Sequence, residues 1–158
     1  ENLILSLDKI KNDKTCNLWS PLEGFTSQFK LSKDLLKFYD YVTGKIFKDA
    51  DYPYRILGIE ELEITNLLII GALCPKDISS HWISIADNYN GGYLSLDLSS
   101  SKLEGGYDSF HETRGLVGNT PVIAKPFTEL LYRLYDNKGE YTYWFKSEFN
   151  HLYGDAYD

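Results

Sequence analysis

The fold is decided by the stretch His81-Trp82-Ile83-Ser84-Ile85-Ala86-Asp87-Asn88-Tyr89-Asn90-Gly91-Gly92-Tyr93-Leu94-Ser95-Leu96-Asp97-Leu98. Its second half alternates leucine with tyrosine, serine and aspartate, which is the two-residue period of a β-strand. Asn90-Gly91 tolerates the positive φ angles of a tight turn, so the stretch predicts a β-hairpin that turns there. We expect the leucines to face a core and the residues between them to face outward.

Helical patterns lie before this hairpin. Apolar residues recur at helical spacing from Leu3 to Ile10. Trp19-Ser20-Pro21 is expected to open a second, short helix that runs to Phe29. Ser32 is placed to cap a third helix, for which Gly44 would supply the left-handed end. The front third of the chain is therefore predicted to be helical.

Short strands and one further helix complete the pattern. Strands are expected at residues 54–57 and 106–110, with a helical turn near Glu60. The apolar run 67–73 has the length of a buried strand or short helix, and its periodicity does not separate the two. Pro126 suits the first turn of a helix whose apolar stripe starts at Phe127 and which Gly139 can close. The tail from 141 to 157 is expected to add a strand or helix.

These elements predict one α+β domain spanning residues 1–158. A central antiparallel or mixed β-sheet is flanked by N-terminal helices and a C-terminal amphipathic helix. A chain of 158 residues, 43% of them hydrophobic, can bury a sufficient core without a metal or a disulfide.

Charge limits the partners of the chain. The 23 acidic and 16 basic residues give a formal charge of -7, which disfavours direct binding of nucleic acid and attracts a basic protein. The alternative is that the acidity serves solubility only. No apolar run approaches the roughly 20 residues of a membrane span. Two isolated cysteines, Cys16 and Cys74, suit a reducing compartment, so we expect a cytoplasmic protein.

Catalytic motifs are missing from the sequence. His81, His111 and His151 are the only histidines, and none has a Cys, Asp or Glu at metal-ligand spacing. The chain has no phosphate loop, dinucleotide fingerprint or nucleophile elbow. We therefore expect no cofactor, no metal and no enzymatic activity. A small hydrolase whose site assembles only in space is a remote alternative, because catalytic triads are set by geometry.

Four segments, in this order along the chain, resemble the SUKH superfamily, which includes the yeast cell-wall-synthesis regulator and many bacterial immunity proteins. They are Trp19-Ser20-Pro21, the helix from Leu31 to Gly44, the hairpin of residues 82–98, and Val122-Ile123-Ala124-Lys125-Pro126-Phe127 with the helix that follows. The chain departs from the family pattern at four positions, which are Ser32, Thr43, Gly92 and Pro126.

The resemblance implies an α+β fold and a non-enzymatic protein that binds and neutralises a cognate polymorphic toxin, often a nuclease. A regulatory scaffold for an endogenous protein partner is the alternative. The expected contact surface is the polar side of the hairpin with its neighbours, where tyrosines suit binding hot spots. It comprises Asp87, Asn88, Tyr89, Tyr93, Asp97, Tyr107 and Asp108. For Asp87, capping of the turn is an equally good reading.

Overall fold

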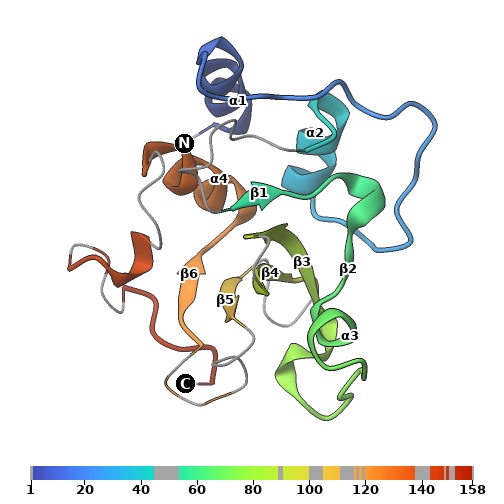
Figure 1. The fold of residues 1–158 in the computed structure, drawn as a ribbon, viewed down its shortest axis with the longest axis vertical. Helices are drawn as coiled ribbons and strands as arrows, with labels where there is room; N and C mark the ends of the chain where they lie inside the picture. The colour runs from blue at the N-terminus through green and yellow to red at the C-terminus, as the bar shows by residue number, and fades with distance from the viewer. Residues whose placement is uncertain are drawn as a thin grey trace.

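The computed structural model of the chain describes residues 2–44, 54–88, 91–99, 105–110, 116, 118, 120–137, 143–147, 149 and 152–157. The α-helices are α1 (Leu3–Asn12), α2 (Lys33–Tyr41), α3 (Thr65–Ile69) and α4 (Phe127–Asp136), and the 3-10 helices are η1 (Ile59–Glu61), η2 (Ile78–His81) and η3 (Tyr143–Phe145). The strands are β1 (Arg55–Ile56), β2 (Glu63–Ile64), β3 (Trp82–Asp87), β4 (Gly92–Asp97), β5 (Gly106–Phe110) and β6 (Val122–Ala124). The fold is α+β, as predicted (Figure 1).

One antiparallel sheet organises the described residues. Its strand order is β1-β3-β4-β5-β6, and β2 also pairs with β3. The predicted hairpin strands are confirmed: β3 pairs with β4, with Ile83 opposite Leu96 and Ser84 opposite Ser95. Gly91 has a φ of 79°, as a tight turn requires, while Asn90 lies outside the described residues. The predicted strand at 106–110 is present as β5, and the sheet gains a further strand, β6, that the sequence pattern did not predict.

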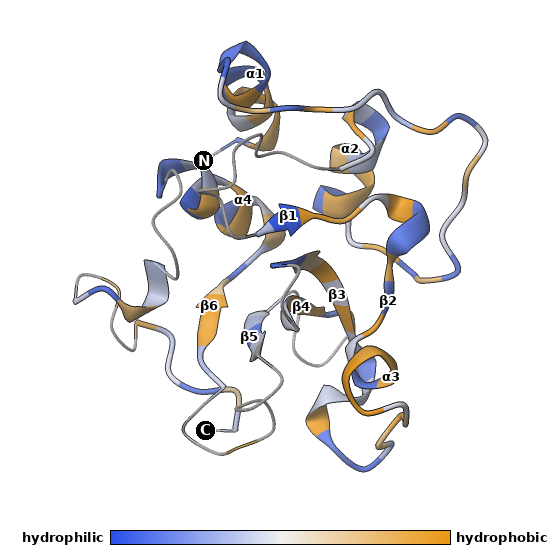
Figure 2. Cartoon of the chain, in the orientation of Figure 1, coloured by the Kyte–Doolittle hydropathy of each residue, from blue (hydrophilic) through white to orange (hydrophobic). Residues whose placement is uncertain are grey.

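The main core lies between one face of this sheet and three helices. Leu94 and Leu96 are fully buried there together with Phe127 of α4, as expected. The rings of Phe38 and Phe127 meet edge to face, with centroids 5.0 Å apart. The hydrophobic side of α1 is turned toward α4 and its hydrophilic side faces away (Figure 2).

The helix that begins after Ser32 confirms the predicted cap, but it ends earlier than expected. The Ser32 hydroxyl accepts a hydrogen bond from the Leu35 amide at 3.3 Å. The helix ends at Tyr41, so Gly44 does not terminate it. Gly44 has a φ of 127°, and a Cβ there would lie 2.8 Å from the backbone nitrogen of Gly58. The glycine is needed for this close approach of two backbones.

The prediction of a helix from Trp19 to Phe29 is wrong. The structure has no helix between α1 and α2, and the segment loops away from the sheet (Figure 1). Trp19, Leu22 and Phe25 are 52, 45 and 43% exposed. A short helix is stabilised mainly by packing of its apolar face, and here these apolar side chains are not buried.

The apolar run 67–73 is another departure from expectation. It begins in the short helix α3, which is one of the two predicted forms, but most of the run is not buried. Leu67 and Leu68 are 38 and 42% exposed, and Ile70 and Leu73 are 55 and 48% exposed. The residues buried by α3 are the polar pair Thr65 and Asn66.

The C-terminal elements match the prediction in part. Pro126 occupies the cap position just before α4, one residue earlier than expected, and Gly139 lies outside the described residues. The tail contributes η3 and an isolated bridge between Pro121 and Asp155.

Replacing Phe127 by alanine should lower the free energy of unfolding by about 3–5 kcal/mol, because a fully buried ring leaves a cavity. Phe145→Ala is the matched control, since Phe145 is 70% exposed, and its effect should stay within about 0.5 kcal/mol. Chemical denaturation of both variants measures the difference. Equal losses would contradict the assignment of Phe127 to the core.

Candidate partner-binding surface

The seven predicted contact residues separate into an accessible group and a buried group. Asp87, Asn88 and Tyr93 are partly exposed at the turn end of the hairpin, and Tyr89 lies outside the described residues. The other three are buried, at 2% exposed for Asp97, 5% for Tyr107 and 6% for Asp108. The expectation that the polar side of the hairpin faces outward is therefore wrong over most of its length.

Tyr107 belongs to a buried aromatic cluster, and Asp97 lies opposite Trp82 of that cluster in the β3–β4 ladder. The rings of Trp82 and Tyr107 stack with centroids 4.0 Å apart and planes within 3° of parallel. Ala156 of the C-terminal tail is buried in the same cluster, and Tyr153 and Tyr157 pack against it. Burial and the nearby Asp97 carboxylate raise the pKa of Tyr107 to about 12, so the phenol stays neutral at physiological pH.

Asp108 binds a residue of the C-terminal tail on the leucine face of the sheet, which is the face opposite the aromatic cluster. It lies opposite Leu94 in the β4–β5 ladder, and its Oδ2 accepts a hydrogen bond from Trp144 Nε1 at 3.0 Å. Trp144 belongs to the main core. The carboxylate therefore satisfies a buried indole and has an internal, structural role.

The middle of the polar face is closed by what we call the hydroxyl layer, formed by Thr65, Ser84, Ser95 and Ser109. The Thr65 hydroxyl lies 2.8 Å from that of Ser84 and 2.7 Å from that of Ser95. The Ser95 and Ser109 hydroxyls are 2.8 Å apart. All four residues are fully buried. Each hydroxyl can donate once and accept twice, so the layer satisfies polar groups from three strands and α3.

At the turn end of the hairpin, Arg55 bridges two carboxylates. Its Nη1 and Nη2 donate to the two oxygens of Glu61 at 3.1 and 2.8 Å. Its Nε and Nη2 donate to Asp87, both at 3.2 Å. The Asp87 carboxylate is thus bound by Arg55 of β1, while its side chain is still 16% exposed. Capping of the turn by Asp87 stays a prediction.

The Glu61 carboxylate also caps the short helix η1. It accepts a hydrogen bond from the Gly58 amide at 3.0 Å. Partial burial opposes its ionisation, but hydrogen bonds from Arg55 and Gly58 outweigh that cost and lower the pKa of Glu61 below its ordinary value. Burial also opposes the charge of Arg55, but its hydrogen bonds to Glu61 and Asp87 outweigh that cost and raise the pKa of Arg55.

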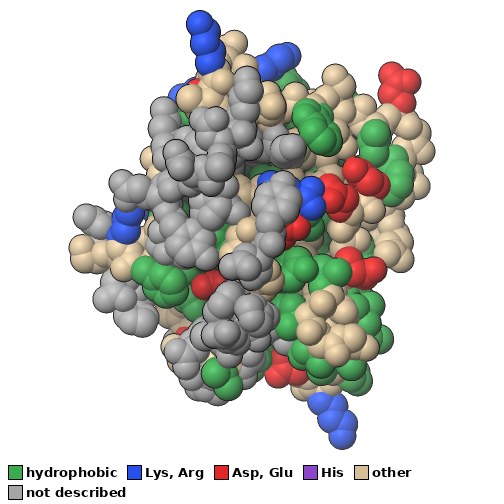
Figure 3. All heavy atoms as spheres, viewed as in Figure 1, with side chains coloured by type: hydrophobic (Ala, Val, Ile, Leu, Met, Phe, Trp, Pro, Cys, Tyr) green, Lys and Arg blue, Asp and Glu red, His purple; other side chains and the backbone are tan. Residues whose placement is uncertain are grey.

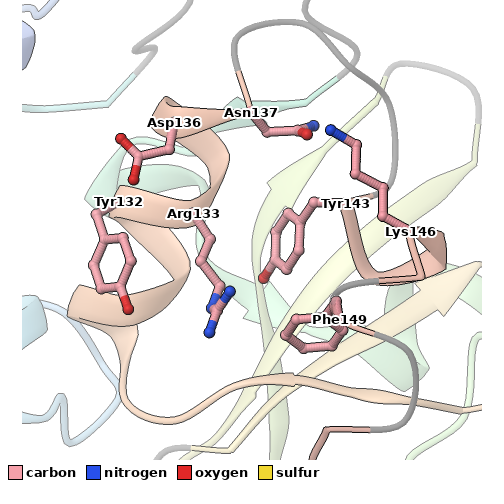
Figure 4. A pocket seen from close by; sticks show the side chains of 7 residues that line it. All are labelled: Tyr132, Arg133, Asp136, Asn137, Tyr143, Lys146 and Phe149. Carbon is pink, nitrogen blue, oxygen red and sulfur yellow. The ribbon is translucent and has the colours of Figure 1, made fainter.

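A pocket of about 250 Å³ opens between α4 and the C-terminal tail. Figure 4 shows Arg133, Tyr143 and Phe149 pointing toward one another, while Asp136 points away. The guanidinium carbon of Arg133 lies 5.0 Å from the centre of the Phe149 ring, and an Arg133 nitrogen lies 3.6 Å from Glu129. Arg133 of α4 therefore binds the C-terminal tail through a cation–π contact with Phe149. Among the described residues that line this pocket, none is a serine, a cysteine or a histidine.

The groups considered for catalysis are dispersed. Within the described part of the chain, no three His, Cys, Asp or Glu side chains are placed to hold a metal. Cys16 and Cys74 are half-buried thiols, His81 is exposed, and His111 and His151 lie outside the described residues. Among the described helices, none is long and apolar enough to cross a membrane.

The contact residues predicted from the sequence do not include the exposed apolar side chains of α3. Thr65 binds the polar face of the hairpin, so Leu67 and Leu68 lie on the solvent side of that helix. The signal was present in the sequence, because Thr65-Asn66 directly precedes the apolar run and offers polar groups that a serine-bearing sheet face can satisfy.

An antiparallel sheet with helices on its leucine face, and with a hairpin and terminal helix in the expected order, agrees with the family resemblance. Residues 19–133 match the SMI1 / KNR4 family (SUKH-1), and the chain belongs to that family. It is similar to a protein of Bacillus subtilis (strain 168) named immunity protein YokJ. The two are 39% identical over 155 residues, which cover 96% of this chain and 93% of that protein.

Thr65→Val should cost about 1–3 kcal/mol of unfolding free energy, because it removes a buried hydroxyl that Ser84 and Ser95 both use. Thr26→Val, at an exposed position in the segment between α1 and α2, is the matched control and should be nearly neutral. Thermal and chemical denaturation report both values. A neutral Thr65→Val would show that the hydroxyl layer does not stabilise the fold.

The Arg55–Glu61 pair predicts a pH-dependent contribution to stability. Because the folded-state pKa of Glu61 is lowered, its contribution is fully present above the ordinary value of 4.5 and is lost as pH falls through the folded pKa. The stability difference between wild type and Glu61→Gln should therefore shrink below pH 4.5. Glu23→Gln, at an exposed site, is the control and should change the free energy of unfolding by less than about 0.5 kcal/mol. A constant gap for Glu61→Gln would contradict the pairing.

Proposed function

We propose that this chain is a non-enzymatic immunity protein that acts in the cytoplasm by binding a cognate polymorphic toxin domain and neutralising it. The observation that carries the proposal is the 39% identity, over 96% of the chain, to a protein named as an immunity protein. Membership of the SMI1 / KNR4 family (SUKH-1) supports it. Neutralisation is expected to work by occlusion of the toxin, and it requires no cofactor.

The accessible residues at the turn end of the hairpin are the proposed contacts there. Asp87 and Tyr93 present a carboxylate and a phenol on strands that pair with each other. Asn88 accepts a hydrogen bond from the Gly92 amide at 2.8 Å, which fixes the base of the turn. Tyr89 is proposed with them from the sequence. Asp97, Tyr107 and Asp108 are assigned to the interior, where they support these contacts.

The formal charge of -7 supports a basic partner. Opposite charge speeds the encounter of two proteins by long-range attraction, and it selects against acidic competitors. Phosphate backbones are repelled by the same field, so a nuclease toxin would be blocked through its protein surface, with no contact from this chain to nucleic acid.

The proposal predicts that the chain rescues cells that express the toxin domain encoded beside its gene. Growth with the toxin alone, with the chain, and with Phe127→Ala as a destabilised control measures rescue, and size-exclusion chromatography of the purified pair measures the complex. Tyr93→Ser should weaken rescue. Tyr41→Ser, which replaces a tyrosine that is 41% exposed on α2, should not. The proposal fails if no neighbouring toxin domain is neutralised or bound, and an endogenous partner would then be favoured.

A further inference from the structure

The helix α3 presents apolar residues to solvent and polar residues to the protein interior, which reverses the usual arrangement of a surface helix. Thr65 and Asn66 are fully buried. The exposed apolar residues of this helix, of the loop after it and of η2 form what we call the α3 patch. It consists of Leu67, Leu68, Ile70, Leu73 and Ile78, which are between 38 and 55% exposed. Figure 3 shows hydrophobic side chains gathered around α3.

Hydrogen bonds from Asn66 hold the α3 patch in this shape. The backbone carbonyl oxygen of Asn66 accepts hydrogen bonds from the backbone amides of Ile70 and Gly71 at 2.9 and 3.1 Å. Its Nδ2 donates to the Leu73 carbonyl at 3.0 Å and to the Ser79 hydroxyl at 3.2 Å. One buried side chain thus ties the helix to the loop that returns to η2. A surface fixed in this way loses little conformational entropy when a partner covers it.

The surroundings of the α3 patch are acidic. The segment that carries the patch, residues 54–88, contains five carboxylates and two cationic side chains, Arg55 and Lys76. Two of the carboxylates adjoin the patch along the chain: Glu63 lies in β2 just before α3, and Asp77 caps η2 just before Ile78. Arg55 is already bonded to both Glu61 and Asp87. Figure 3 shows Asp and Glu side chains between the hydrophobic cluster at α3 and the upper part of the same face. Contiguous exposed apolar surface of this kind marks interaction sites.

We propose that the α3 patch docks a protein surface with an apolar centre and a rim of lysine and arginine. The apolar centre would cover Leu67 and Leu68, and the cationic rim would lie against the carboxylates that adjoin the patch, Glu63 and Asp77. This inference rests on the proposed function in one respect, which is that the partner surface belongs to the toxin domain.

The charge around the α3 patch favours this occupant over two others. A second copy of the chain would bring the same acidic rim against itself, because a two-fold contact pairs identical surfaces. A membrane surface is disfavoured because the cytoplasmic leaflet is itself negatively charged. A basic partner is the occupant that satisfies the apolar and the charged parts of the surface together.

A defined probe tests this chemistry without the toxin. The probe is a synthetic amphipathic helix with leucine on one face and lysine on the other, compared with a leucine–glutamate helix and a serine–lysine helix. Titration calorimetry on the full chain should show binding of the leucine–lysine helix at least about tenfold tighter than either comparison helix, and it should weaken with added salt. Equal binding of the leucine–glutamate helix would overturn the inference.

Matched variants locate the binding. Each of two double variants should reduce the affinity for the leucine–lysine helix by a factor on the order of 30, the size of a hot-spot loss. The two variants are Leu67→Ser/Leu68→Ser and Ile70→Ser/Leu73→Ser. Leu5→Ser/Leu36→Ser is the control, because those leucines are 59 and 50% exposed on α1 and α2. Thermal melts verify folding of each variant. Equal loss in the control, or self-association of the wild type that Leu67→Ser/Leu68→Ser abolishes, would overturn the proposed occupant.

The rescue assay separates this inference from the proposed function. If the wild type and the α1/α2 control rescue cells and both α3 variants fail, the α3 patch is the toxin-docking surface. If the folded α3 variants rescue as well as the wild type, the docking assignment is wrong while the proposed function stands. If the wild type itself does not rescue, the proposed function is wrong, and the probe titration decides the surface chemistry independently.

Discussion

The Thr65 hydroxyl, shared between Ser84 and Ser95, is the interaction on which the arrangement of the structure depends. The central hairpin buries leucine on one face and serine on the other, and a serine face can be covered only by groups that satisfy its hydroxyls. Thr65 supplies such a group at the start of α3. The requirement fixes which side of α3 meets the sheet, and it leaves the leucines of that helix outside. This one polar contact therefore helps to bury the serine face of the sheet and also leaves the α3 leucines exposed to solvent.

Sequence patterns anticipated the elements whose local and tertiary preferences agree. The hairpin, α1, the Ser32 cap and α4 each combine a clear period with a suitable cap or turn residue, and each is present. The helix expected after Trp19 is absent, and two of its three apolar positions, Leu22 and Phe25, are exposed, so little packing would stabilise it. The outward polar face was misjudged at Asp97, since strand alternation cannot show that the C-terminal tail returns to cover that face. Such coverage is a long-range property that periodicity does not contain.

The candidate surface was predictable in its chemistry and less so in its position. The acidic charge and the abundance of tyrosine pointed to protein binding, and membership of the SMI1 / KNR4 family (SUKH-1) agrees with that emphasis. Asp87 and Tyr93 remain accessible, whereas Asp97, Tyr107 and Asp108 support the strands from within. The exposure of the α3 leucines was not predicted, because an apolar run of this length is ordinarily assigned to a buried core.

The separation of polar anchors from exposed leucines in α3 has an evolutionary consequence. Exchanges at Leu67, Leu68, Ile70 or Leu73 leave the hydrogen bonds of Thr65 and Asn66 in place, so these positions can vary at little cost to folding. Related proteins that face different partners could then diverge in recognition while they keep one scaffold. Natural variation within the family should accordingly concentrate on the outer side of this helix and spare the two residues that precede its leucines.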